Sequence, residues 1–120
     1  MKQNVAEERL TIESLRQRLE KFPRARLAHL PTPLEPMPRL SERLGGPALW
    51  VKRDDATGLA FGGNKARVLE FRLGAAQAQG ADCIVAGAAI QSNFCRQTAA
   101  ACAKLGLEAY LVLREVEGQS

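Results

Sequence analysis

Aromatic residues are scarce in this chain, at 5% of 120 residues, and none of its apolar runs approaches the length of a membrane span. The core is therefore expected to consist of Leu, Val, Ile and Ala. Hydrophobic residues make up 46% and charged residues 25% of the chain, close to the average of soluble globular proteins, which argues against disorder of the whole chain. The first ten residues are too polar for a signal peptide, so we expect a cytosolic protein with room for one domain at most and no membrane partner.

Cysteines are few and are not arranged for disulfides or zinc. Cys83, Cys95 and Cys102 are an odd number, and no two of them form a CxxC pair. Each lies in an apolar or Ala-rich stretch, so we predict three buried thiols in a reducing compartment.

The basic residues do not form a cluster. The net charge is +4, but Lys and Arg are spread along the chain and no basic stripe is interleaved with aromatics. We therefore expect no nucleic-acid partner, and we interpret the Arg-rich residues 16–26 as a solvated helix face.

The first third of the chain predicts one helix and a connector. Apolar residues at 10, 12, 15 and 19 predict a short amphipathic helix that begins near Thr11 or Ser14 and ends before Pro23. Residues 27–38 contain four prolines, which predict an extended connector, because proline lacks the backbone donor. Pro38 then opens a helical turn that Gly45 and Gly46 close.

The remainder alternates between strands and helices. We predict strands at 48–55, 83–88 and 108–114, a glycine-rich loop at 57–64, and helices at 65–80 and 92–106. This order predicts an α/β fold with a parallel sheet, helices on its faces, and residues 84–86 buried on both sides. A sheet of three strands with two open edges is incomplete, so the chain is interpreted as a fragment.

Gly62-Gly63-Asn64-Lys65 is the first candidate site. The glycines let the backbone pass close to a ligand, Asn64 is a good N-cap, and Lys65 then begins a helix. A helix N-terminus and burial both favour a neutral amine, which is the form that attacks an aldehyde. Taken alone, a lysine after a glycine turn is usually a solvated surface residue.

Gln91-Ser92-Asn93 is the second candidate site. It follows a buried strand and opens a helix, with Ser92 as the predicted N-cap, where amide and hydroxyl groups can receive an anion such as a carboxylate. Taken alone, such a pair usually only caps its helix. Because both loops follow strands expected to be neighbours in one parallel sheet, we predict that the two sites meet in one crevice.

The stretch from 31 to 71, with GGNKAR, followed by QSNFCRQTAAACAKLGL, resembles the D-cysteine desulfhydrase and 1-aminocyclopropane-1-carboxylate (ACC) deaminase family. The resemblance covers roughly residues 27 to 113. It implies a pyridoxal 5'-phosphate (PLP) enzyme with the fold of the tryptophan synthase β-subunit, here as the N-terminal part of a three-layer α/β sandwich. Residues 1–48 would belong to the larger PLP domain, and residues 49–120 would begin the smaller domain.

The same resemblance implies roles for the candidate residues. Lys65 would hold PLP as a Schiff base, and Asn93 would hydrogen-bond the ring hydroxyl of the cofactor. Ser92 would lie beside the substrate carboxylate and Cα and take part in proton transfer, with Gln91 in the same substrate-binding turn. Arg67, Arg96 and Asp54-Asp55 would be ion-pair scaffolding.

The implied activity is elimination from a small amino acid, with release of sulfide or ammonia and a keto acid. D-cysteine, ACC, cysteate and diaminopropionate are all open as substrates, and the complete protein is expected to be a homodimer. Phe94 stands where the family commonly has a polar residue near the substrate. The family's phosphate-binding loop, the residue facing the pyridine nitrogen and the substrate-side tyrosines are expected beyond residue 120, so the 120 residues alone are expected to be inactive.

Two other interpretations stay open. The chain could itself be an interaction module without activity. It could also be a relative of cysteine synthase or threonine dehydratase, although the Gln-Ser-Asn turn argues against those enzymes.

Overall fold

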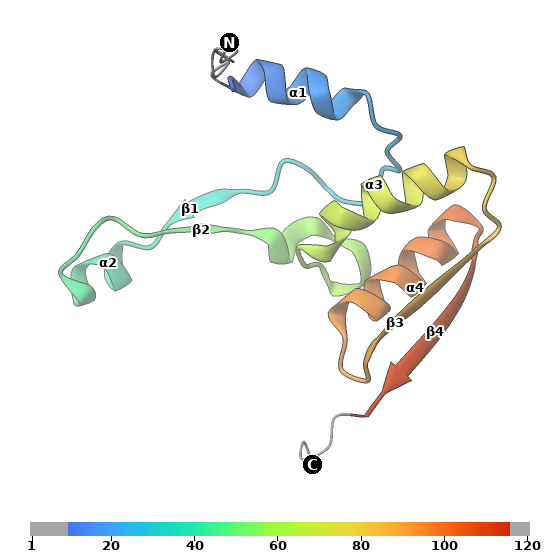
Figure 1. The fold of residues 1–120 in the computed structure, drawn as a ribbon. Helices are drawn as coiled ribbons and strands as arrows, with labels where there is room; N and C mark the ends of the chain where they lie inside the picture. The colour runs from blue at the N-terminus through green and yellow to red at the C-terminus, as the bar shows by residue number, and fades with distance from the viewer. Residues whose placement is uncertain (1–9, 116–120) are drawn as a thin grey trace, which may run out of the picture.

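The computed structural model describes residues 10–115, which form helices and strands in one chain (Figure 1). Their order is α1 (Ile12–Glu20), β1 (Leu34–Pro36), α2 (Pro38–Leu44), β2 (Trp50–Lys52), two 3₁₀ turns (Asp54–Thr57 and Leu59–Phe61), α3 (Lys65–Ala78), β3 (Cys83–Ala89), α4 (Asn93–Leu105) and β4 (Glu108–Arg114).

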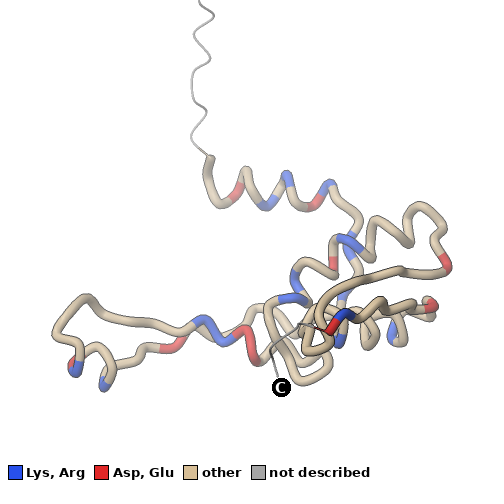
Figure 2. Tube along the Cα trace, turned by 60° about the horizontal axis from the view of Figure 1, so that its bottom comes forward, with Lys and Arg blue, Asp and Glu red and all other residues tan. Residues whose placement is uncertain are grey.

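Helix α1 begins and ends as predicted. The Thr11 side chain accepts a hydrogen bond from Ser14 N, and the Ser14 side chain accepts one from Thr11 N, which forms a capping box. No residue of α1 is buried, and the helix lies apart from the other elements in Figure 1. Arg16 and Arg18 are exposed on α1, as predicted, but Arg24 lies beyond the end of the helix and pairs with Glu70, so the prediction of a helix face over residues 16–26 is wrong for its second half. Lys and Arg are distributed over several elements (Figure 2).

Residues 34–52 form an arm that projects from the rest of the molecule (Figure 1). In this arm, β1 and β2 are antiparallel, with Glu35 opposite Val51, and α2 lies at the tip and ends at Gly45 in the left-handed conformation. The predicted strand at 48–55 is therefore shorter than expected, and its assignment to the parallel sheet is wrong. Proline keeps the connector extended, so β1 can pair with β2 where the chain returns from α2. The apolar pattern of residues 48–55 predicted a strand, but such a pattern does not specify which strand it pairs with.

Strands β3 and β4 are parallel, with Val85 opposite Tyr110, and α4 connects them. Helix α4 packs against both strands, so the predicted α/β fold is confirmed. The prediction of burial on both sides is wrong for Val85, which is 70% exposed, whereas Ala86 is buried. Val85, Tyr110 and Val112 are all exposed on the face of the sheet opposite the helices, within the described part of the chain.

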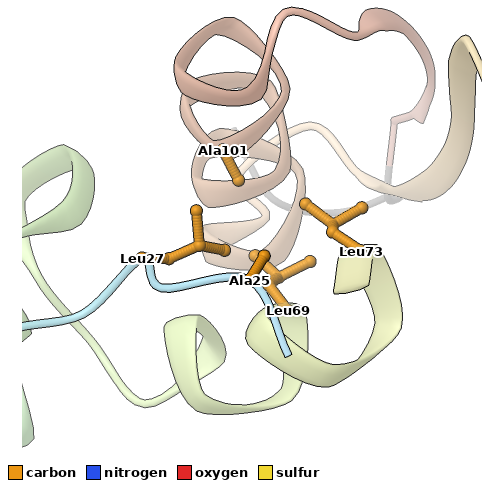
Figure 3. Packing of buried hydrophobic residues seen from close by; sticks show 5 residues of the cluster. All are labelled: Ala25, Leu27, Leu69, Leu73 and Ala101. Atoms are coloured by element: carbon orange, nitrogen blue, oxygen red, sulfur yellow. The ribbon is translucent and has the colours of Figure 1, made fainter. Parts of the chain in front are cut away.

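The core lies where the connector passes over α3 and α4. Figure 3 shows its five buried residues, which are Ala25, Leu27, Leu69, Leu73 and Ala101. A Cβ on Gly74 would meet the backbone of Pro23 and Arg24, so this glycine allows the connector to cross α3 closely. This cluster consists of Leu and Ala, two of the four residue types expected from the scarcity of aromatics.

The predicted burial of the cysteines holds for two of the three. Cys95 and Cys102 are buried, but Cys83 is exposed, because it lies on the uncovered face of the sheet. No helix within residues 10–115 has the length and apolar character needed to cross a bilayer. The predicted division between residues 48 and 49 stays a prediction.

Candidate functional site

The turn that leads into α3 is built on two glycines. Gly62 has a φ of +76° and Gly63 a φ of +128°, values that glycine adopts without steric cost. A Cβ on Gly62 would overlap the carbonyl oxygen of Asp55. The turn therefore excludes a side chain at Gly62 because it passes close to the chain's own backbone, whereas the sequence interpretation invoked a ligand.

Thr57 holds this turn on one side. Its Oγ1 accepts a hydrogen bond from Gly63 N and donates one to the Gly63 carbonyl oxygen, each at 2.9 Å. Gly63 N also donates to the carbonyl oxygen of Asp54 at 2.9 Å. Because Thr57 is fully buried, these bonds replace the water that its hydroxyl has lost and fix the backbone that precedes Lys65.

An ion pair between Asp54 and Arg67 ties the start of this loop to α3. Arg67 Nε and Nη2 donate to the two carboxylate oxygens at 2.9 and 2.7 Å, and Thr32 Oγ1 donates to Asp54 Oδ1 at 2.9 Å. The hydrogen bond from Arg67, followed by that from Thr32, lowers the pKa of Asp54 to about 2. The ion pairing predicted for Arg67 and Asp54 is confirmed, and Asp55 likewise pairs with Arg53.

Lys65 is the first residue of α3, as predicted. Asn64 occupies the N-cap position, but its backbone is helical and its side chain makes no capping hydrogen bond, so the predicted cap is wrong. The Lys65 side chain is exposed, so residues 10–115 do not supply the burial that was expected around it. An exposed primary amine at a helix N-terminus is accessible to an aldehyde from solvent.

The second candidate turn opens α4. Ser92 is its N-cap, as predicted, and its Oγ accepts a hydrogen bond from Cys95 N at 3.2 Å. Asn93 Oδ1 accepts from Arg96 Nη2 at 3.0 Å, and Gln91 is exposed. The Asn93 amide hydrogens and the Ser92 hydroxyl hydrogen are thus left to donate at the start of α4. An ion pair was predicted for Arg96, but its guanidinium donates to the neutral side chain of this asparagine.

Gln97 brings the two turns together. Its Nε2 donates to the Gly62 carbonyl oxygen at 2.8 Å, and its side chain is fully buried. Gln97 follows Asn93 by four residues, so both lie on the same face of α4, and that face is directed at the glycine turn. Gln97 thus links the glycine turn to α4 through a helix side chain and not through neighbouring strands, whereas a crevice shared by Lys65, Ser92 and Asn93 stays a prediction.

No role was assigned to Gln97 from the sequence, although it lies inside the quoted motif. The signal that could have identified it is its spacing of four residues from Asn93 on a predicted helix. A second feature was also missed: Ala60 and Phe61 have φ values of +46° and +67°, and Phe61 is 95% exposed. Non-glycine residues with such angles are uncommon and concentrate at functional sites.

Phe94, the second residue of α4, is half-buried. Its side chain packs against the core cluster, and the Arg72 guanidinium carbon lies 5.9 Å from the centre of its ring. The side chain thus contacts the core between α3 and α4, and its predicted place near the substrate stays a prediction.

Three comparisons with known proteins identify the family of this chain. A family model described as "Pyridoxal-phosphate dependent enzyme" matches residues 25–119. D-cysteine desulfhydrase of Klebsiella pneumoniae (strain 342) is 52% identical over 102 residues, which are 85% of this chain and 31% of that protein. D-cysteine desulfhydrase of Salmonella newport is 51% identical over 100 residues, or 83% of this chain and 30% of that protein.

A crystal structure described as an ACC deaminase homologue is also similar, with a TM-score of 0.77 and 46% identity. The match covers 82% of this chain and 30% of that structure. The chain therefore spans 30–31% of the length of the relatives it matches.

Proposed function

Because this chain belongs to the family of pyridoxal-phosphate-dependent enzymes, we propose that it is part of a lyase or deaminase that carries PLP on Lys65 and acts on a small amino acid. The observation that carries the proposal is the hydrogen bond from Gln97 to Gly62, which joins the turn before Lys65 to the helix that begins with Asn93. The desulfhydrase relatives favour D-cysteine as substrate, with release of sulfide, ammonia and a keto acid.

The donors at the two turns fit the proposed cofactor. Arg96 occupies the oxygen of the Asn93 side chain, so the nitrogen of that amide is the atom presented to a ligand, and it can donate to a ring hydroxyl or its anion. Ser92 accepts from the backbone of its own helix, so its hydroxyl hydrogen can donate to a carboxylate. Lys65 supplies the primary amine that an aldehyde requires.

Each residue then has a role that its position supports. Lys65 would hold the cofactor and, once substrate amine has replaced it, move the proton at the substrate Cα. Asn93 would orient the ring, and Ser92 and Gln91 would bind the substrate carboxylate at the N-terminus of α4, where the helix dipole favours an anion. PLP supplies an electron sink when bound, and the protein supplies orientation and control of protons.

The properties of the complete protein are part of the same proposal. From the resemblance we infer a cytoplasmic homodimer in which residues 1–48 belong to a larger PLP domain and residues 49–120 begin a smaller one. ACC is the second candidate substrate, because the similar solved structure is described as an ACC deaminase homologue.

The lysine assignment is tested by trapping. The full-length protein, incubated with PLP, reduced with borohydride and digested, should carry a phosphopyridoxyl group on the peptide that contains Lys65. Lys65→Arg should abolish this adduct, whereas Lys104→Arg, at an exposed position of α4, should leave it unchanged. An adduct on another lysine in the unchanged protein would refute the assignment.

The substrate is tested separately with the same protein. D-cysteine and ACC are supplied in parallel, and sulfide, ammonia and keto acid are measured. Release of sulfide from D-cysteine supports desulfhydrase activity. Release of ammonia and keto acid from ACC, with no reaction of D-cysteine, supports deaminase activity. Full PLP loading with no reaction of either amino acid would contradict both substrates.

A further inference from the structure

Gln97 has a polar side chain that lies entirely in the interior of the protein, on the second turn of α4. We propose that Gln97 is a positioning residue that fixes the turn of residues 62–65 against the start of α4, and so sets the place of the Lys65 amine relative to Ser92 and Asn93. This inference rests on the proposed function, and it adds a residue to which no role had been given.

The bond from Gln97 requires the amide nitrogen specifically. Its partner is the carbonyl oxygen of Gly62, 2.8 Å away, and a carbonyl can only accept a hydrogen bond. The other atom of the amide, Oε1, is buried and has no hydrogen-bond partner among the described residues. A buried oxygen of this kind destabilises the fold, so a side chain serving only to fill space would be better replaced by methionine or leucine.

The second glycine of the turn lies against the same amide. A Cβ on Gly63 would come within 2.5 Å of Gln97 Nε2, so the amide occupies the space that a side chain would need. Thr57 and Asp54 hold Gly63 through its N–H group, and Thr57 also holds its carbonyl. The turn is therefore held by Thr57 and Asp54 on one side and by Gln97 of α4 on the other.

The hydrogen bond between Gln97 and Gly62 lies close in sequence to candidate site residues on both sides. Lys65 follows Gly63 by two residues, and Asn93 precedes Gln97 by one helical turn on the same face of α4. Because helices are stiff, a shift of the glycine turn relative to α4 would also shift the Lys65 amine relative to Asn93. Productive covalent and hydrogen-bonded geometry tolerates such shifts poorly.

The experiment compares two variants of the full-length protein. Gln97→Glu keeps the shape but places a carboxylate oxygen against the Gly62 carbonyl, and Gln97→Met fills the space without a donor. Gln77→Glu, at an exposed position of α3, controls for the added charge. Leu73→Ala, in the core two turns beyond Lys65, controls for a general loss of stability.

The measurements separate a loosened turn from a lost cofactor. Hydrogen exchange of the peptide covering 58–66 is recorded without PLP, and the PLP concentration needed for half-maximal borohydride trapping on Lys65 is then determined. We expect faster exchange in both Gln97 variants, and a PLP requirement raised about tenfold in Gln97→Met and further in Gln97→Glu. Gln77→Glu and Leu73→Ala should leave the PLP requirement within about twofold of the unchanged protein.

Each outcome decides the proposal. Unchanged hydrogen exchange of the 58–66 peptide in the Gln97 variants would show that Gln97 does not hold the turn. Faster exchange with an unchanged PLP requirement overturns the positioning of Lys65. If Leu73→Ala raises the PLP requirement as much as the Gln97 variants do, the role of Gln97 is merely structural. Absence of trapping on Lys65 in the unchanged protein overturns the proposed function itself, and the exchange data then still decide whether Gln97 holds the turn.

Discussion

Two buried polar side chains on neighbouring helices each hold an irregular segment, and they differ in how completely they are paired. Glu70 of α3 is 2% exposed, and it accepts hydrogen bonds from Leu27 N and Ala28 N at 3.0 Å and from Arg24 Nε at 2.7 Å. Gln97 of α4 is fully buried and, among residues 10–115, makes one side-chain hydrogen bond, to Gly62.

The comparison separates structural anchoring from the positioning of chemistry. Burial of Glu70 opposes ionisation, but the hydrogen bonds from Ala28, Leu27 and Arg24 outweigh it, so the pKa of Glu70 is lowered. This cluster is satisfied within itself and holds the connector over the core. Gln97 is only half satisfied, and its segment leads to Lys65. Burial alone does not distinguish the two roles; what distinguishes them is the segment that each side chain holds.

The largest expected effect comes from breaking the glycine turn. Gly62→Ala would force Asp55 and the turn apart and should lower the free energy of unfolding by about 4 kcal/mol and abolish PLP trapping on Lys65. Gly45→Ala is the matched control, because Gly45 also has positive φ but its Cβ would meet no atom within 4 Å. It should cost about 1 kcal/mol and leave trapping intact. Urea unfolding and borohydride trapping of the full-length protein check both, and equal effects would contradict the turn geometry.

Removing the other anchor should affect stability without affecting the cofactor. Glu70→Ala leaves two backbone donors unpaired and should cost about 3 kcal/mol of unfolding free energy, while the PLP requirement for trapping changes little. Glu42→Ala, at an exposed position of α2, should change stability by less than about 0.5 kcal/mol. A PLP requirement raised as far as in the Gln97 variants would remove the distinction between the two anchors.

A smaller change tests the other side of the turn. Thr57→Val keeps the shape of the side chain but loses both hydrogen bonds to Gly63, and should cost about 2 kcal/mol. Thr57→Ser keeps the hydroxyl and should recover most of this loss. Faster hydrogen exchange in the peptide of 58–66, with unchanged exchange at residues 24–28, would locate the effect at the turn. Equal loss in both variants would show that the methyl group matters more than the hydrogen bonds.

The smallest expected effect is a pH dependence of the unfolding free energy, which arises from Glu70 and its hydrogen bonds to the connector. The pKa of Glu70 is lowered on folding, so its charge contributes stability above its ordinary value of 4.5, and this contribution is lost as pH falls through the folded pKa. Glu70→Gln should therefore cost about 1 kcal/mol at pH 7 and progressively less below pH 4.5. Unfolding of the two proteins is compared from pH 7 to pH 3, and a constant difference would contradict the role of the charge.

Local signals in the sequence predicted the elements well. The start of α1 near Thr11, the ends of α2 and α4 at Gly45 and Gly106, and Ser92 as the N-cap of α4 follow from backbone chemistry within a few residues, and all are confirmed. Contacts between distant residues were predicted less well. The partner of β2 and the exposure of Cys83 and Val85 depend on which surfaces other segments cover, and no local pattern encodes that.

The amino-acid sequence by itself determined the family, the helix and strand types of residues 65–114, and the pair of turns at 62–65 and 91–93, because these depend on short-range geometry and on motifs. Only the tertiary structure decided that Gln97 joins these turns and that Glu70 holds the connector. Both are single side chains reaching segments 35 and 42–46 residues away along the chain. Such pairs form when packing brings the helices to those segments, and packing is a property of the whole chain.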